Sequence, residues 1–136
     1  MAVVFVGMDK ILSCGYSRCA EREISVWDIR NFTQLQTKVI DYSAGLLKPL
    51  YDEDTGILFL GGTGDGSIRF YEIVDDSEVV HYLSEVKFNT PQRDICLLPK
   101  RTVNTSICEV ARILRAIPRT VVPVSFCVPV SMVDLI

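Results

Sequence analysis

Short apolar runs separated by glycine-rich or acidic turns dominate the hydrophobic pattern of this chain. Ile11–Cys14 and Ile57–Leu60 are compact apolar runs, and each is followed, after a turn, by a segment in which apolar and polar residues alternate. Alternation with a period of two is typical of a β-strand with one buried face. Asp65-Gly66, which lies between two such runs, is a strong signal for a tight hairpin turn. The pattern therefore predicts paired strands and an all-β fold.

The two hairpins are copies of one repeating unit. Glu21–Asp28 aligns without a gap on Asp65–Glu72, and each segment opens on an acidic residue and closes on an aromatic-acidic pair. Trp27 and Tyr71 are 44 residues apart, within the ~40–45 residue period of a WD-repeat blade. The spacing predicts a partial WD-repeat β-propeller of about two to three four-stranded blades with a C-terminal extension. The residues that we interpret as structural for the blades are Trp27, Asp28, Asp65, Tyr71 and Glu72.

The repeat also divides the chain. Blade one is predicted over about 1–40, blade two over about 41–84, and a third blade with the C-terminal extension over about 85–136. Thr105–Arg115 has apolar residues at a spacing that suits a short helix, but its β-branched content and the all-β context also fit a strand, and both alternatives stay open. Thr120–Ile136 is apolar and interrupted by prolines. We expect a buried or edge strand pair there, because the segment is too short to cross a bilayer.

Composition and charge exclude several function classes. A charged fraction of 23% and a hydrophobic fraction of 49% are typical of one globular domain. The net charge of −3 gives no bulk attraction to nucleic acid or to an acidic membrane. Five cysteines form no CxxC pair, and His81 is the single histidine, so neither a metal nor another cofactor is predicted. An odd, scattered set of cysteines is typical of reduced thiols in a cytoplasmic protein.

Several suggestive motifs have a simpler structural interpretation. The glycine-rich segment 61–67 lacks the GK[ST] of a phosphate-binding loop, so we interpret it as a flexible hairpin. Asp52–Asp54 lacks the spaced oxygen ligands of a calcium loop. His81 has no nucleophile or orienting acid beside it in the sequence. The sequence therefore predicts no enzyme.

An ordered series of segments resembles the C-terminal part of the coronin propeller. The series consists of Gly15–Arg18 with Glu21-Arg22, Gly45–Pro49, Gly64–Glu72, His81–Leu83, Gln92-Arg93, Pro99–Arg101, Cys108–Arg112 and Pro123–Phe126. These segments keep one order from about Met8 to Pro129, which is nearly the whole chain. An ordered series of this kind is far more specific than one aromatic-acidic dipeptide.

The resemblance to coronins implies a function that the residues alone do not show. Coronins are cytoplasmic, cytoskeleton-associated proteins that bind actin filaments, influence the complex that nucleates branched actin, and oligomerise through a coiled coil. The resemblance implies a non-catalytic scaffold with these partners. No heptad segment is present, so coiled-coil oligomerisation is not supported by this chain. Because two to three blades leave unburied sheet faces, we expect a fragment of a longer protein or a truncated form.

Basic residues are the candidate contacts for such a filament, whose surface is acidic. We place Arg18 and Arg22 in the longer first hairpin loop and Lys100-Arg101 after a strand end. The hypothesis is that these four residues give modest, salt-sensitive contacts to actin filaments or another partner. A generic WD-repeat scaffold that binds other proteins without actin is the alternative, because propeller folds host many functions.

Overall fold

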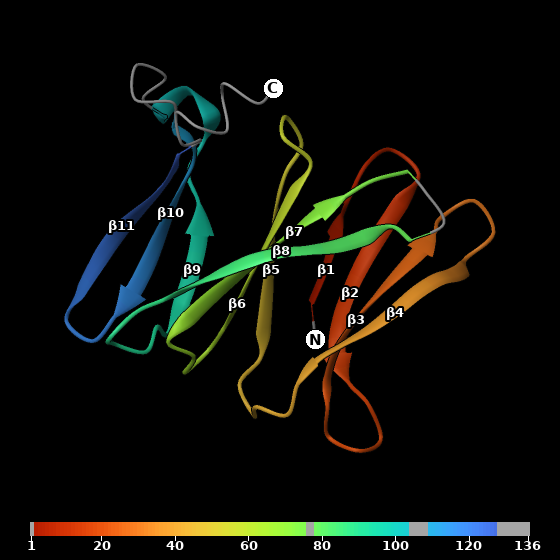
Figure 1. Ribbon diagram of the computed structural model, residues 1–136, viewed down its shortest axis with the longest axis horizontal. Helices are drawn as coiled ribbons and strands as arrows, with labels where there is room; N and C mark the ends of the chain where they lie inside the picture. The colour runs from red at the N-terminus through yellow and green to blue at the C-terminus, as the bar shows by residue number, and fades with distance from the viewer. Residues whose placement is uncertain (1, 76–77, 104–108, 128–136) are drawn as a thin grey trace.

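The protein is built from antiparallel sheets that follow one another along the chain (Figure 1). The computed structural model describes residues 2–75, 78–103 and 109–127, and within them the strands form two four-stranded sheets and one three-stranded sheet. Sheet one contains β1 (Ala2–Phe5), β2 (Lys10–Tyr16), β3 (Arg22–Asp28) and β4 (Thr33–Asp41). Sheet two contains β5 (Leu47–Asp52), β6 (Ile57–Gly62), β7 (Ser67–Ile73) and β8 (Val80–Lys87). Sheet three contains β9 (Asp94–Leu97), β10 (Glu109–Ile117) and β11 (Thr120–Cys127), and the short 3-10 helix η1 (Lys100–Thr102) follows β9.

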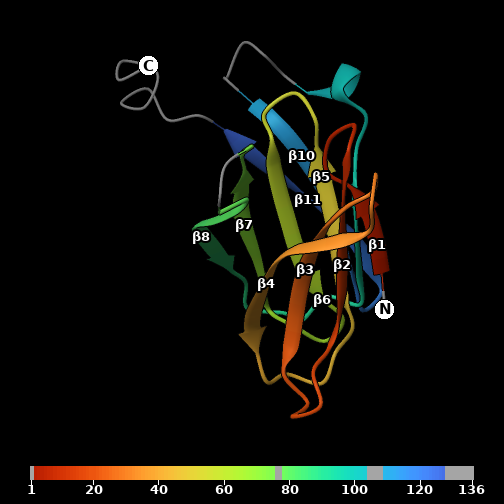
Figure 2. The same cartoon turned by 90° about the vertical axis from the view of Figure 1, so that its right-hand side faces the viewer.

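Each sheet begins with the strand that contacts the neighbouring sheet. β1 contacts β5, and β5 in turn contacts β9, so the first strands of the three sheets lie together. Successive strands then pair outward in chain order in sheets one and two. Figure 2 shows the same arrangement from the side, with the strands of all three sheets running between two ends of the molecule. This is the layout of neighbouring propeller blades, and the predicted all-β fold is confirmed.

The predicted repeat is visible in the strand register. β2 pairs with β3 so that Ile11 lies opposite Trp27, and β6 pairs with β7 so that Leu58 lies opposite Tyr71. On the other side of β3 and β7, the register shifts immediately before Trp27 and before Tyr71, so both sheets carry an irregularity at the equivalent position. The hairpin loops are 17–21 in sheet one and 63–66 in sheet two. The first loop is the longer one, as the sequence predicts.

Two apolar clusters hold the three sheets together. Leu58 and Leu60 of β6 face the cluster shared with sheet one, whereas Phe59 faces the cluster shared with Ile95 and Ile113 of sheet three. Successive residues of a strand point to opposite faces. A strand that packs against sheets on both faces is therefore apolar at every position, which explains the continuous run in β6.

The C-terminal part resolves the alternatives that the sequence leaves open. The segment Thr105–Arg115 is extended where the structure describes it, because β10 starts at Glu109 and pairs with both β9 and β11. The helical alternative is wrong for these residues. Thr120–Cys127 is one edge strand, and residues 128–136 of the predicted strand pair lie outside the described residues. In the described part of the chain, no helix has the length and apolar character required to span a membrane.

Candidate interaction surface

Arg22, which sequence analysis places in an exposed loop, is a buried residue at the start of β3. Its side chain is 1% exposed, and its guanidinium donates to both carboxylate oxygens of Asp41 at 2.6 Å. The same group donates to Asp65 Oδ2 at 2.7 Å and to the Gly45 carbonyl at 3.0 Å. A buried cation is tolerated where charged and polar partners replace water. The prediction that Arg22 contacts a partner at the surface is therefore wrong.

Acidic residues from both sheets surround this guanidinium. The hydrogen bonds from Arg22 lower the pKa of Asp41 from 3.8 to about 2. Arg69 of β7 adds a second ion pair to Asp41 at 2.9 Å. Asp65 lies in the turn between β6 and β7, as predicted, and it also links sheet two to Arg22 of sheet one. The acids at this position hold the two sheets together.

Lys100 is likewise engaged within the molecule. It lies in η1, its side chain is 36% exposed, and its ammonium is 2.9 Å from Asp52 Oδ2. It also donates to the Val110 carbonyl of β10. These contacts join the end of β5 to sheet three. The neighbouring Arg101 is exposed.

Ion pairs connect neighbouring sheets at both ends of the strands. Arg22–Asp65 and Lys10–Asp75 join sheet one to sheet two. Lys48–Asp94 and Lys100–Asp52 join sheet two to sheet three. Arg22–Asp65 and Lys48–Asp94 lie at the end that carries the β2–β3 loop, which is lowest in Figure 1. Lys10–Asp75 and Lys100–Asp52 lie at the opposite end, and Lys100 belongs to η1. Two of the four candidate contacts, Arg22 and Lys100, therefore form ion pairs between sheets.

The candidate contacts do not form one continuous patch. The loop that contains Arg18 and the helix η1 with Arg101 lie at opposite ends of the strands in both Figure 1 and Figure 2. This follows from the topology, because the connections after the first and second strands of an antiparallel sheet lie at opposite ends. Arg18 and Arg101 are both exposed. A single flat partner surface would reach only one of them.

The predicted blade residues have different surroundings. Trp27 donates from Nε1 to Ser13 Oγ of β2 at 3.0 Å, and Tyr71 is buried against Tyr82 with its ring centroid 5.5 Å away. Asp28 accepts a hydrogen bond from the backbone N–H of Arg30 at 2.9 Å, and Glu72 is exposed on β7. Trp27 and Tyr71 contact neighbouring strands, while the two acids lie near the strand ends.

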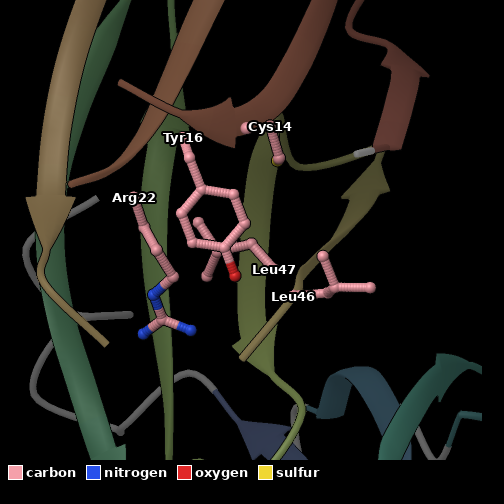
Figure 3. Close-up of a pocket in the computed structure, with 6 residues that line it drawn as sticks. Cys14, Tyr16, Arg22, Leu46 and Leu47 are labelled. Carbon is pink, nitrogen blue, oxygen red and sulfur yellow. The ribbon is translucent and has the colours of Figure 1, made fainter. Parts of the chain in front are cut away.

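A small hollow lies next to Arg22. Figure 3 shows this hollow, where Tyr16, Arg22 and Leu46 line a cavity of about 10 Å³, room for one water molecule at most. Cys14 borders this cavity, and burial raises the pKa of its thiol to about 12, so it is a poor nucleophile. The described residues contain no group of histidine, cysteine and acidic side chains that could hold a metal ion. The exposed loops are the remaining candidates for function.

Solved structures establish the class of protein. The fold matches the WD40 domain of coronin from Toxoplasma gondii with a TM-score of 0.83 and 30% identity, covering 89% of this chain and 31% of that chain. It also matches the C-terminal WD40 domain of Sif2 with a TM-score of 0.61, covering 94% of this chain and 33% of that one. At 15% identity the second likeness concerns the fold alone. The three sheets are thus part of a WD-repeat β-propeller.

A curated relative is similar to most of this chain. Coronin-A of Dictyostelium discoideum is 53% identical over 122 residues, which is 89% of this chain and 27% of Coronin-A. No protein-family model matches the chain. The chain is a homologue of Coronin-A over most of its length, and the resemblance to coronins predicted from the sequence is confirmed. It spans about a quarter of the length of that relative.

Proposed function

We propose that this chain binds actin filaments and acts as a non-catalytic scaffold of the cytoplasmic actin cytoskeleton. The observation that carries the proposal is the 53% identity to Coronin-A across most of the chain, together with the coronin WD40 fold. Actin binding, cytoskeletal localisation and contact with the branched-actin nucleating complex are what the coronin resemblance implies. Each of them is a property to be tested on this chain.

The surface chemistry supports a binding role. Arg18 and Arg101 are exposed cations, and exposed charges steer association with a surface of opposite sign. The proposal predicts contact through loops that connect the strands, since loops on a rigid sheet scaffold commonly carry binding.

Co-sedimentation with actin filaments tests the proposal directly. The purified chain is mixed with increasing concentrations of filaments at low and high salt, and the pelleted fraction is measured. We expect saturable pelleting that weakens as salt rises, because screening shortens the range of charge attraction. Circular dichroism and size-exclusion chromatography of the same sample check that the chain is folded and unaggregated. A folded chain that stays in the supernatant at every filament concentration would exclude filament binding and favour a scaffold for other proteins.

A further inference from the structure

Five loops gather at one end of the molecule and form a single surface. They are 17–21, 42–46, 63–66, 88–93 and 118–119, and we call the surface the hairpin end. Backbone hydrogen bonds join neighbouring loops: Thr63 donates to the Leu46 carbonyl at 2.9 Å, and Gly64 donates to the Gln92 carbonyl at 2.8 Å. The Arg93 N–H donates to the Ala116 carbonyl of β10 at 2.6 Å. The hairpin end therefore extends across all three sheets, at the lower side of Figure 1.

Three exposed arginines lie at the hairpin end. Arg18, Arg93 and Arg119 are exposed, and each comes from a different loop. Of the acids at this end, Asp41, Asp65 and Asp94 are ion-paired with bases, whereas Glu21 of loop 17–21 is half-buried and accepts a hydrogen bond from Ser17 Oγ at 3.4 Å. Because pairing compensates three of these acids while the three arginines face solvent, the net field outside this surface is positive.

A further cation lies beneath the same loops. Arg115 of β10 is buried, and it donates to Gln92 Oε1 at 2.9 Å and to the Thr90 carbonyl at 2.5 Å. Its guanidinium carbon stacks 3.7 Å from the centroid of the Phe88 ring. None of these partners carries a negative charge, and no ion pair is found for Arg115 in the described part of the chain. Its charge therefore adds to the positive field of the hairpin end.

The opposite end of the strands has the reverse character. Its exposed acids are Glu53, Asp54, Asp75 and Glu78, in the turns after β5 and β7, and of these Asp75 is ion-paired with Lys10. Its exposed cations are Arg30, which is paired with Asp28, and Arg101. Lys100, in the loop after β9, is paired with the buried Asp52. The chain is thus electrically polar along its strands despite a net charge of only −3.

Exposed apolar side chains accompany the arginines at the hairpin end. Tyr42 is 76% exposed and Leu46 is 55% exposed, and both lie in the connection between sheets one and two. Tyr16, 42% exposed, donates from its hydroxyl to the Ala44 carbonyl at 2.5 Å and so fixes this connection (Figure 3 shows Tyr16 and Leu46 among the residues that line one small cavity). Aromatic anchors surrounded by arginines are typical of the energetically important parts of protein interfaces.

We propose that the hairpin end is the surface through which the chain contacts an acidic face of the actin filament, with Tyr42 and Leu46 as apolar anchors and Arg18, Arg93 and Arg119 as steering cations. The inference rests on the proposed filament binding. It places the filament contact at the hairpin end and not at Lys100-Arg101, which lie at the opposite end of the strands. The occupant is a protein surface because exposed apolar anchors accompany the cations.

Two matched double variants test where the filament contact lies, independently of whether the chain binds filaments at all. Arg18→Glu/Arg93→Glu reverses two charges at the hairpin end, and Arg30→Glu/Arg101→Glu makes the same net charge change at the opposite end. We expect the first variant to lose filament affinity at least tenfold, chiefly in the association rate, while the second stays within about twofold of wild type. Tyr42→Ala should weaken binding with an unchanged salt dependence. Thermal melts of all variants check that folding is retained.

Each outcome has a defined meaning. Wild-type pelleting that both double variants retain, or lose to the same extent, would overturn the hairpin end while leaving filament binding intact. Failure of the folded wild-type chain to pellet would overturn the proposed function and the inference with it. Binding of wild type to phosphatidylserine vesicles without binding to filaments would assign the basic surface to lipid and overturn both.

Discussion

Arg22 at the start of β3 and Asp65 in the turn between β6 and β7 are joined by an ion pair of 2.7 Å. The pair links sheet one to sheet two, and Asp41 completes the set of partners around the guanidinium. Because Arg22 is buried, its charge depends on these acids for compensation. The relationship explains why an arginine and an acid occur at these positions without any need for an external ligand.

Removal of Arg22 should destabilise the chain strongly. Arg22→Ala leaves Asp41 and Asp65 without their main partner at the sheet contact, and we expect a loss of about 3 kcal/mol in the free energy of unfolding. Urea unfolding followed by circular dichroism measures it. Arg30→Ala is the control, because Arg30 pairs with Asp28 at the surface and its removal should leave the urea midpoint nearly unchanged. Equal midpoints for the two variants would contradict the structural role of Arg22.

Asp41 should make the folding stability of the chain depend on pH in the acidic range. Its pKa is lowered from 3.8 to about 2 in the folded chain, chiefly by the Arg22 hydrogen bonds. A carboxyl with a lowered pKa stabilises the fold above its unfolded pKa, and this contribution is lost as pH falls through the folded value. We therefore expect stability to drop between about pH 4 and pH 2. The Asp41→Asn variant should unfold more easily at pH 7, and its stability should fall less steeply as the pH is lowered. Thermal melts over this pH range measure both effects. Parallel pH profiles for the variant and wild type would show that Asp41 does not cause the acid dependence.

Gly61 on β6 allows close approach of sheet three. A Cβ added at Gly61 would lie 2.6 Å from Ile95 Cδ1, closer than two carbons can pack. Gly61→Ala should thus cost about 1–3 kcal/mol through overpacking. Ile95→Val removes that δ-methyl, so Gly61→Ala should cost less in the Ile95→Val background. A double-mutant cycle by urea unfolding measures the coupling, and additive effects would show that the two residues do not touch.

The cysteines should differ in reactivity according to burial. Cys14 is buried with its thiol pKa raised to about 12, whereas Cys19, Cys96 and Cys127 are exposed. Since the thiolate is the reactive form, a short pulse of iodoacetamide at pH 7.5 should modify the exposed cysteines and spare Cys14. Peptide mass spectrometry assigns the sites, and urea should release Cys14 to reaction. Rapid labelling of Cys14 in the native chain would mean that sheets one and two separate readily.

Local patterns made the fold predictable from the sequence. The 44-residue spacing of Trp27 and Tyr71 reflects equivalent positions in successive sheets, and the turn signal at Asp65-Gly66 is set by neighbouring residues. The apolar run Ile57–Leu60 predicts a strand that pairs with the next one, and β6 does so. The segment around β10 remained ambiguous because its apolar spacing fits either a helix or a strand, and pairing with β9 and β11 decides it.

The candidate site was less predictable because its charges find partners far along the chain. Arg22 and Asp65 are separated by 43 residues, and Lys100 pairs with Asp52, so no local pattern distinguishes these bases from solvent-exposed ones. The hairpin end is likewise assembled from loops of three sheets. One signal was available: Arg22 and Asp65 occur in aligned hairpins, where a charged residue at a hairpin end can contact the equivalent turn of the next sheet.

Hydrogen exchange of the chain with and without actin filaments tests the central claim most directly, because one measurement reports both whether binding occurs and where. The account predicts slower exchange in peptides that cover loops 17–21, 42–46 and 88–93, and unchanged exchange in the turns 53–56 and 98–103. Protection confined to those turns, or no protection at saturating filament concentration, would contradict it.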